Sequence, residues 1–194
     1  RSTLDSYHNR FAGEEVFILG TGPSLDKVPV KAFQALTRRH TFGVNTLLAY
    51  GRLQAPTTFY CVAESEWLSG ISIPMVIEPF YDLPAHRFYA HHWPLAEVDL
   101  PGWTWVPFDS GSSIEGGHFA GLGSELPYIA KGGGVIGMTV QIACWLGFRT
   151  VYLLGVDATQ EGHAKGTGID DTTHPQAPQG GLIRAMNAAQ AVMA

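Results

Sequence analysis

The chain of 194 residues contains little charge, few basic residues and no long apolar run. Charged side chains make up 15% of it, against roughly 25% in an average chain. With 12 Lys and Arg against 17 Asp and Glu, the net charge is −5. This balance argues against nucleic acid as a partner, because such binding draws on basic surface. No apolar run approaches the roughly 20 residues of a membrane-spanning helix, so we predict no transmembrane segment.

Cysteine is scarce as well, and its spacing does not match a metal or redox motif. Cys61 and Cys144 lie far apart and form no CxxC pair, so we expect two reduced core residues in a cytoplasmic protein. The chain starts at Arg1 rather than Met and ends at Ala194 within a helical pattern. We therefore expect a piece of a longer chain.

The residues that are abundant predict one globular α/β domain over residues 1–194. Hydrophobic residues make up 45% and aromatic residues 11%, enough to bury a full core at this length. Strand-like runs alternate with helical patterns, which predicts a mainly parallel sheet of about five to seven strands covered on both faces. The predicted strands are 15–19, 41–44, 58–62, 74–77 and 150–154, with weaker ones at 87–89 and 103–106. The predicted helices are 30–39, 138–146 and one from about Leu182.

A Gly- and Ser-rich segment over residues 109–134 interrupts this pattern. Residues 111–137 contain nine of the 23 glycines, so we predict an active-site loop or a disordered connection there. Gly133 and Gly134 precede a predicted helix, where their N–H groups would lie at the positive end of the helix dipole and suit a phosphate. A plain flexible hinge is the alternative.

A second glycine-rich turn follows the strand predicted at 15–19. In Gly20-Thr21-Gly22-Pro23-Ser24 the glycines would let the backbone approach a phosphate closely, with N–H groups free to donate, and Ser24 adds a hydroxyl. An ordinary tight turn is the alternative. No GxxxxGK[ST] P-loop occurs anywhere in the chain.

The turn does not match the dinucleotide-binding fingerprint. Leu25 stands where that motif has its third glycine, and no Asp or Glu occurs between Asp26 and Glu64, where the acid that holds a ribose would lie. NAD binding is therefore disfavoured. The acid-free stretch contains basic residues that either create a positive potential beside the glycine turn or form a solvated helix face: Lys27, Lys31, Arg38, Arg39 and Arg52.

Three polar residues follow other predicted strands. Asn45 ends the strand predicted at 41–44, where an amide would serve a ligand or a turn. Asp157 follows the strand predicted at 150–154, a place from which a carboxylate can orient a hydroxyl or a metal-bound water. His174 lies in the polar loop beyond it, and a histidine can act as general base at neutral pH or be merely solvated.

The order and spacing of these segments resemble one family. The segments are VFILGTGPSL, TFGVNT, TFYCVAE and GGGVIGMTVQIACWLGFRTVYLLGVD, followed by a loop with HP. Together they are similar to the domain-of-unknown-function 115 group, also called MptE-like, which is related to the bacterial sialyltransferases of glycosyltransferase family 42. The resemblance covers nearly the whole chain except the region from about Tyr81 to Ser124.

The resemblance implies a single Rossmann-like three-layer domain that binds a nucleotide. In the sialyltransferases the first glycine loop and the Asn after the second strand bind the nucleotide, which points to Gly20, Thr21, Gly22, Ser24 and Asn45 here. A late-loop His acts as base on the acceptor, and His174 is the match. The family usually has Asn between the two glycines, where this chain has Thr21.

We therefore predict a nucleotide-dependent transferase, with glycosyl transfer of the sialyl type from a nucleotide sugar favoured. That reaction uses a base and phosphate donors and requires no metal cofactor. Two alternatives stay open. One is a Mg²⁺-dependent 6-hydroxymethylpterin diphosphokinase, for which Asp157, Asp170 and Asp171 would hold the metal. The other is a non-catalytic nucleotide-binding module.

Overall fold

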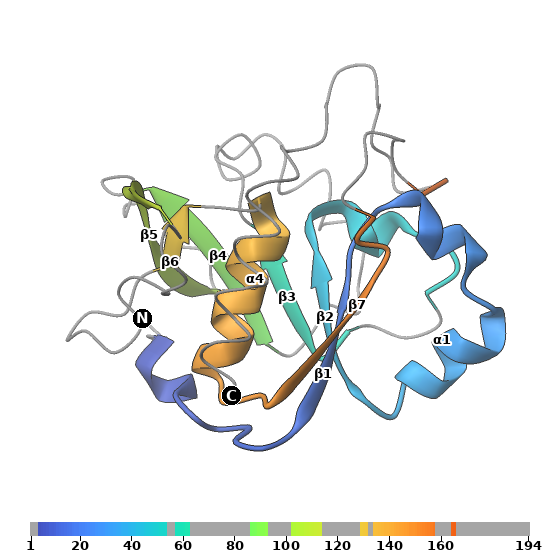
Figure 1. Cartoon of the computed structure of the whole chain (residues 1–194), viewed down its shortest axis with the longest axis horizontal. Coiled ribbons are helices and arrows are strands. Elements are labelled where there is room, and N and C mark those ends of the chain that lie inside the picture. Colours follow the sequence, from blue (N-terminus) through green and yellow to red (C-terminus); the bar gives the residue numbers. More distant parts are fainter. Residues whose placement is uncertain are drawn as a thin grey trace.

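A seven-stranded sheet forms the centre of the fold (Figure 1). The computed structural model describes residues 4–53, 57–62, 86–92, 102–113, 129–131, 134–157 and 164–165. The strands are β1 (Glu15–Leu19), β2 (His40–Val44), β3 (Phe59–Val62), β4 (His86–His92), β5 (Thr104–Ser113), β6 (Ile129–Lys131) and β7 (Thr150–Leu154). The strand predicted at 74–77 and the helix predicted from Leu182 lie outside the described residues.

All the paired strands run parallel, in the order β6-β5-β4-β3-β2-β1-β7. The register pairs Leu19 of β1 with Gly43 of β2 on one side and with Leu154 of β7 on the other. The carboxyl ends of these three strands therefore lie at the same level. The predicted parallel α/β sheet is confirmed.

The prediction of a loop over residues 109–134 is wrong at both ends of that range. Residues 109–113 belong to β5, residues 129–131 form β6, and the helix α4 begins at Gly134. The pairing of β5 with β6 is irregular between Asp109 and Ser113. Glycine, serine and aspartate have low strand propensity, but pairing with neighbouring strands outweighs that weak local preference.

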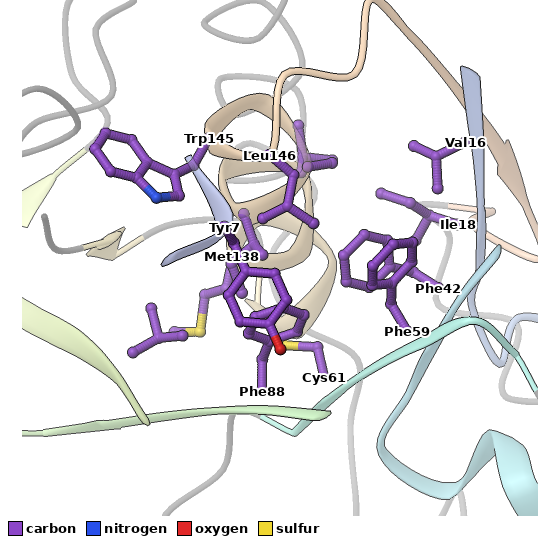
Figure 2. Packing of buried hydrophobic residues seen from close by; sticks show 14 of the residues in the cluster. Tyr7, Val16, Ile18, Phe42, Phe59, Cys61, Phe88, Met138, Trp145 and Leu146 are labelled. Atoms are coloured by element: carbon purple, nitrogen blue, oxygen red, sulfur yellow. The ribbon is translucent and has the colours of Figure 1, made fainter. Parts of the chain in front are cut away.

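Helices cover both faces of the sheet, which confirms the three-layer arrangement (Figure 1). On one face lies α4 (Gly134–Trp145), with the short η1 (Leu4–Tyr7) near its end. On the other lie η2 (Pro23–Lys27), α1 (Val30–Leu36) and η3 (Asn45–Ala49). The cluster under α4 includes Val16, Ile18, Phe42, Phe59, Phe88, Met138 and Leu146 (Figure 2). The cluster on the opposite face includes Leu19, Leu25, Phe33, Leu47 and Tyr60.

The two cysteine thiols and the length of the helices bear on nucleophilic catalysis and on membrane insertion. Both cysteines are free, and burial raises the pKa of the Cys61 and Cys144 thiols to about 12. Neither thiol is ionised at neutral pH, so neither is an activated nucleophile. Within the described ranges, no helix has the length and apolar character needed to span a bilayer.

Candidate functional site

The chain order of the strands reverses at β1. From β1 the chain builds β2 and β3 on one side, and it returns with β7 on the other. In open α/β sheets, ligands bind outside the carboxyl ends of the strands at such a reversal. We call the turns that follow β1, β2 and β7 the switch-point turns; they comprise residues 20–24, 45–46 and 155–157.

The turns after β1 and β7 hold each other through backbone hydrogen bonds. The N–H of Gly20 donates to the Leu154 carbonyl at 2.8 Å, and the N–H of Gly22 donates to the Gly155 carbonyl at 2.7 Å. A Cβ at Gly20 would overlap the Gly155 oxygen, and one at Gly22 would lie 2.7 Å from that oxygen and overlap a carboxylate oxygen of Asp157. The φ of Gly22 is an ordinary −69°. Glycine is required here by the close approach of two turns.

Asp157 adds a side-chain bond to this contact. Its Oδ2 accepts a hydrogen bond of 2.8 Å from the N–H of Ser24, in the first turn of η2. The first N–H groups of a helix have no partner within the helix, so a carboxylate that accepts from one of them stabilises the turn. The side chain predicted to be catalytic therefore also links the turns after β1 and β7.

Asp157→Ala is expected to lower the free energy of unfolding by about 1–2 kcal/mol, because the Ser24 N–H loses a charged acceptor in a half-buried position. Asp157→Asn keeps an oxygen acceptor and should lose less than half of that. Urea unfolding of both variants measures the difference. An Asp157→Ala chain as stable as the wild type would contradict this role.

The N–H groups predicted to be free for a phosphate are largely used within the protein. Those of Gly20, Gly22 and Ser24 donate to the turn after β7. Within the described residues, the remaining donors of the β1 turn are the Thr21 N–H and the hydroxyls of Thr21 and Ser24, which make no hydrogen bond there. A ligand at this edge would thus meet Thr21 and Ser24 rather than a glycine cradle.

Asn45 lies beside this turn, at the end of β2. Its φ is +43°, in the left-handed region that Asn tolerates better than most residues. Its carbonyl accepts a hydrogen bond from the Tyr60 hydroxyl, and the residue is buried. The next residue, Thr46, is also buried, and its hydroxyl has no hydrogen-bond partner among the residues that the structure describes. Because β1 and β2 pair Leu19 with Gly43, Thr21 and Asn45 each come two residues after that pair, at the same edge of the sheet.

A hydrogen-bonded group centred on Asp26 connects the β1 turn to the chain beyond β7. Asp26 accepts from the Lys165 N–H at 3.0 Å through Oδ2 and from the Tyr50 hydroxyl at 3.0 Å through Oδ1. The bond from the Lys165 backbone is the main reason why the pKa of Asp26 is lowered, with Tyr50, Arg52 and the Lys165 charge adding to it. Asp26 and Lys165 were not predicted as site residues, because neither lies in a recognisable motif. Thr46 lies in the TFGVNT segment, but no role was predicted for it.

The basic residues predicted near the glycine turn are placed differently. Arg38 and Arg39 lie between α1 and the start of β2, which puts them at the amino edge of the sheet, opposite the switch-point turns. Arg52 donates to the carbonyls of Asp26 at 2.5 Å and Val28 at 2.8 Å, so it is a structural residue. The predicted positive potential at the turn therefore does not come from these three arginines.

Of the remaining predicted site residues, the structure describes only Gly134. Gly134 is the exposed first residue of α4 and follows β6 at the far edge of the sheet from β7. Gly133 and His174 lie outside the described residues, as do Asp170 and Asp171. Across the described ranges, no three His, Cys, Asp or Glu side chains gather as a metal site would require.

The comparisons with known proteins bear mainly on the fold. No protein-family model matches the chain, and no curated protein sequence matches it, so the resemblance to the domain-of-unknown-function 115 group stays a prediction. The chain is similar to the solved structure of the MAf glycosyltransferase from Magnetospirillum magneticum AMB-1, with a TM-score of 0.55 and 16% identity. The similarity covers 98% of this chain and 33% of that one. The chain thus spans about a third of the length of that solved structure, and the likeness concerns the fold.

Proposed function

We propose that the chain is the nucleotide-binding domain of a glycosyltransferase that uses a nucleotide-activated sugar, with sialyl-type transfer from a CMP-sugar as the leading case. The main support is the reversal of strand order at β1, where Thr21 and Ser24 offer hydroxyls at one edge of the sheet. Thr46, at the same edge, has a buried hydroxyl with no hydrogen-bond partner among the described residues. The fold similarity to a glycosyltransferase adds support at a coarse level.

The proposed reaction moves a sugar from the nucleotide phosphate to an acceptor hydroxyl. The bond between the anomeric carbon and the phosphate oxygen breaks, a bond to the acceptor oxygen forms, and the acceptor proton passes to a base. We propose His174 as that base, from its place in the sequence after β7 and from the resemblance to the sialyltransferases. The switch-point turns would hold the leaving nucleotide, whose phosphate gains negative charge as the bond breaks.

A thermal-shift panel tests this proposal. CMP, CDP, UDP, GDP, ATP and a pterin are each added with and without Mg²⁺, since a ligand that binds the native state raises its melting temperature by mass action. We expect CMP to raise the melting temperature by several degrees at about 100 times its Kd, with or without Mg²⁺. Stabilisation by ATP or the pterin only with Mg²⁺ would favour the diphosphokinase instead. Stabilisation by CMP without turnover of any CMP-sugar would favour a non-catalytic module.

A further inference from the structure

The β1 turn offers two hydroxyls and one backbone N–H as neutral donors, to which a cation would add a charge that favours a phosphate. The three arginines predicted near the turn do not supply that charge, since Arg52 is bonded to backbone carbonyls, and Arg38 and Arg39 lie at the opposite edge of the sheet. Another segment that reaches the β1 turn is therefore a candidate source of the charge. Among the described residues, the pair Ala164 and Lys165 reaches that turn.

Two hydrogen bonds donated by backbone N–H groups hold this pair against the β1 turn and η2. The N–H of Ala164 donates to the Thr21 carbonyl at 2.6 Å, and the N–H of Lys165 donates to Asp26 Oδ2 at 3.0 Å. Ala164 is 3% exposed and packs in the cluster that contains Leu25. Bonds from two consecutive residues, together with a buried methyl group, hold the backbone of residues 164–165 in one place.

The side chain of Lys165 is exposed, while its backbone is held. Within the described ranges, no Asp or Glu carboxylate lies within 4.0 Å of the Lys165 ammonium. The ion pair found in those ranges joins His40 to Glu14 instead. The Lys165 charge helps to lower the pKa of Asp26, but the two side chains form no ion pair. The ammonium is therefore available to an anion that enters beside Thr21.

We propose that Lys165 provides the positive charge that binds the phosphate of a nucleotide at the switch-point turns, with the Thr21 N–H and the Thr21 and Ser24 hydroxyls donating to the same phosphate. This inference rests on the proposed function, because it assumes that a nucleotide binds at this edge. An ammonium on a flexible stem beside neutral donors is a common way to bind a phosphate whose oxygens accept several hydrogen bonds.

The test compares CMP with cytidine by calorimetric titration, since the two probes differ only in the phosphate. Lys165→Ala is expected to raise the Kd for CMP roughly tenfold, the effect of losing one charged hydrogen bond at an exposed site. It should change the Kd for cytidine less than twofold, and Lys165→Arg should restore most of the CMP affinity. Arg38→Ala is the control, because Arg38 is also exposed but lies at the opposite edge of the sheet, and its replacement should leave both affinities unchanged.

The other results of the titration distinguish a failure of the Lys165 assignment from a failure of the proposed function. Unchanged CMP affinity in Lys165→Ala would overturn the assignment of Lys165 and leave the proposed function standing. An equal loss for CMP and cytidine would also overturn it, because Lys165 would then act through the structure of the site. A wild-type chain that binds neither probe would overturn both the proposed CMP-sugar function and this inference.

Discussion

Replacing His174 by alanine is expected to lower kcat for release of CMP from a CMP-sugar by roughly 10²–10⁴-fold, the usual contribution of a general base. The Kd for CMP should stay nearly unchanged, because a base that acts on the acceptor does not touch the nucleotide in the ground state. His174 follows β7 in the sequence, and β7 ends beside the β1 turn. Single-turnover kinetics and calorimetric titration of the same variant measure the two quantities.

His163→Ala is the matched control for His174→Ala. His163 also follows β7 in the sequence but comes only six residues after Asp157, and its replacement should change kcat little. The diphosphokinase alternative predicts the opposite pattern, with a small effect at His174 and a large one for Asp157→Ala in a Mg²⁺-dependent assay. A fully active His174→Ala protein would remove the glycosyl-transfer mechanism proposed above.

Gly22→Val is expected to raise the Kd for CMP by roughly 100-fold or more, because it separates the turns after β1 and β7. An added Cβ would lie 2.7 Å from the Gly155 carbonyl oxygen and overlap the Asp157 carboxylate. Forcing atoms into such a contact also lowers the free energy of unfolding by about 3 kcal/mol. The displaced turn contains the Thr21 and Ser24 groups that would bind the phosphate.

Gly51→Val separates this effect from a general cost of removing a glycine. Gly51 is exposed in the turn after η3, and a Cβ added there meets no atom within 4 Å. This variant should keep both its stability and its affinity for CMP. Gly22→Ala, the milder change, should weaken CMP binding in the same direction if Gly22→Val does not fold. A folded Gly22→Val protein that binds CMP as the wild type does would contradict a ligand at the switch-point turns.

The parallel sheet was predictable because its signals are local. The apolar runs at 15–19 and 150–154 are strands with those bounds, and the helical spacing from Val30 marks α1. Where a strand contains residues of low propensity, as β5 does from Asp109 to Ser113, the local signal is too weak and only pairing with β6 decides. The predicted loop at 109–134 was too long for that reason.

The candidate site was predictable only in part. A turn after a parallel strand lies at the carboxyl edge whichever strands are its neighbours, so the sequence alone placed Gly20–Ser24, Asn45 and Asp157 at that edge. It could not establish which of these turns touch. Whether β7 lies beside β1 or at the other edge of the sheet leaves the hydrophobic pattern of every strand unchanged.

The tertiary structure decided that point, and with it the roles of several residues. Because β7 pairs with β1, Asp157 reaches Ser24 across 133 residues of chain and Lys165 reaches Asp26 across 139. Instead of the predicted glycine phosphate cradle, these contacts form two turns bonded to each other. They also bring the backbone of Lys165, which was not among the basic residues predicted there, close to the β1 turn. Local patterning thus determined the elements and the edge at which a ligand would bind, whereas the strand order determined which side chains meet there.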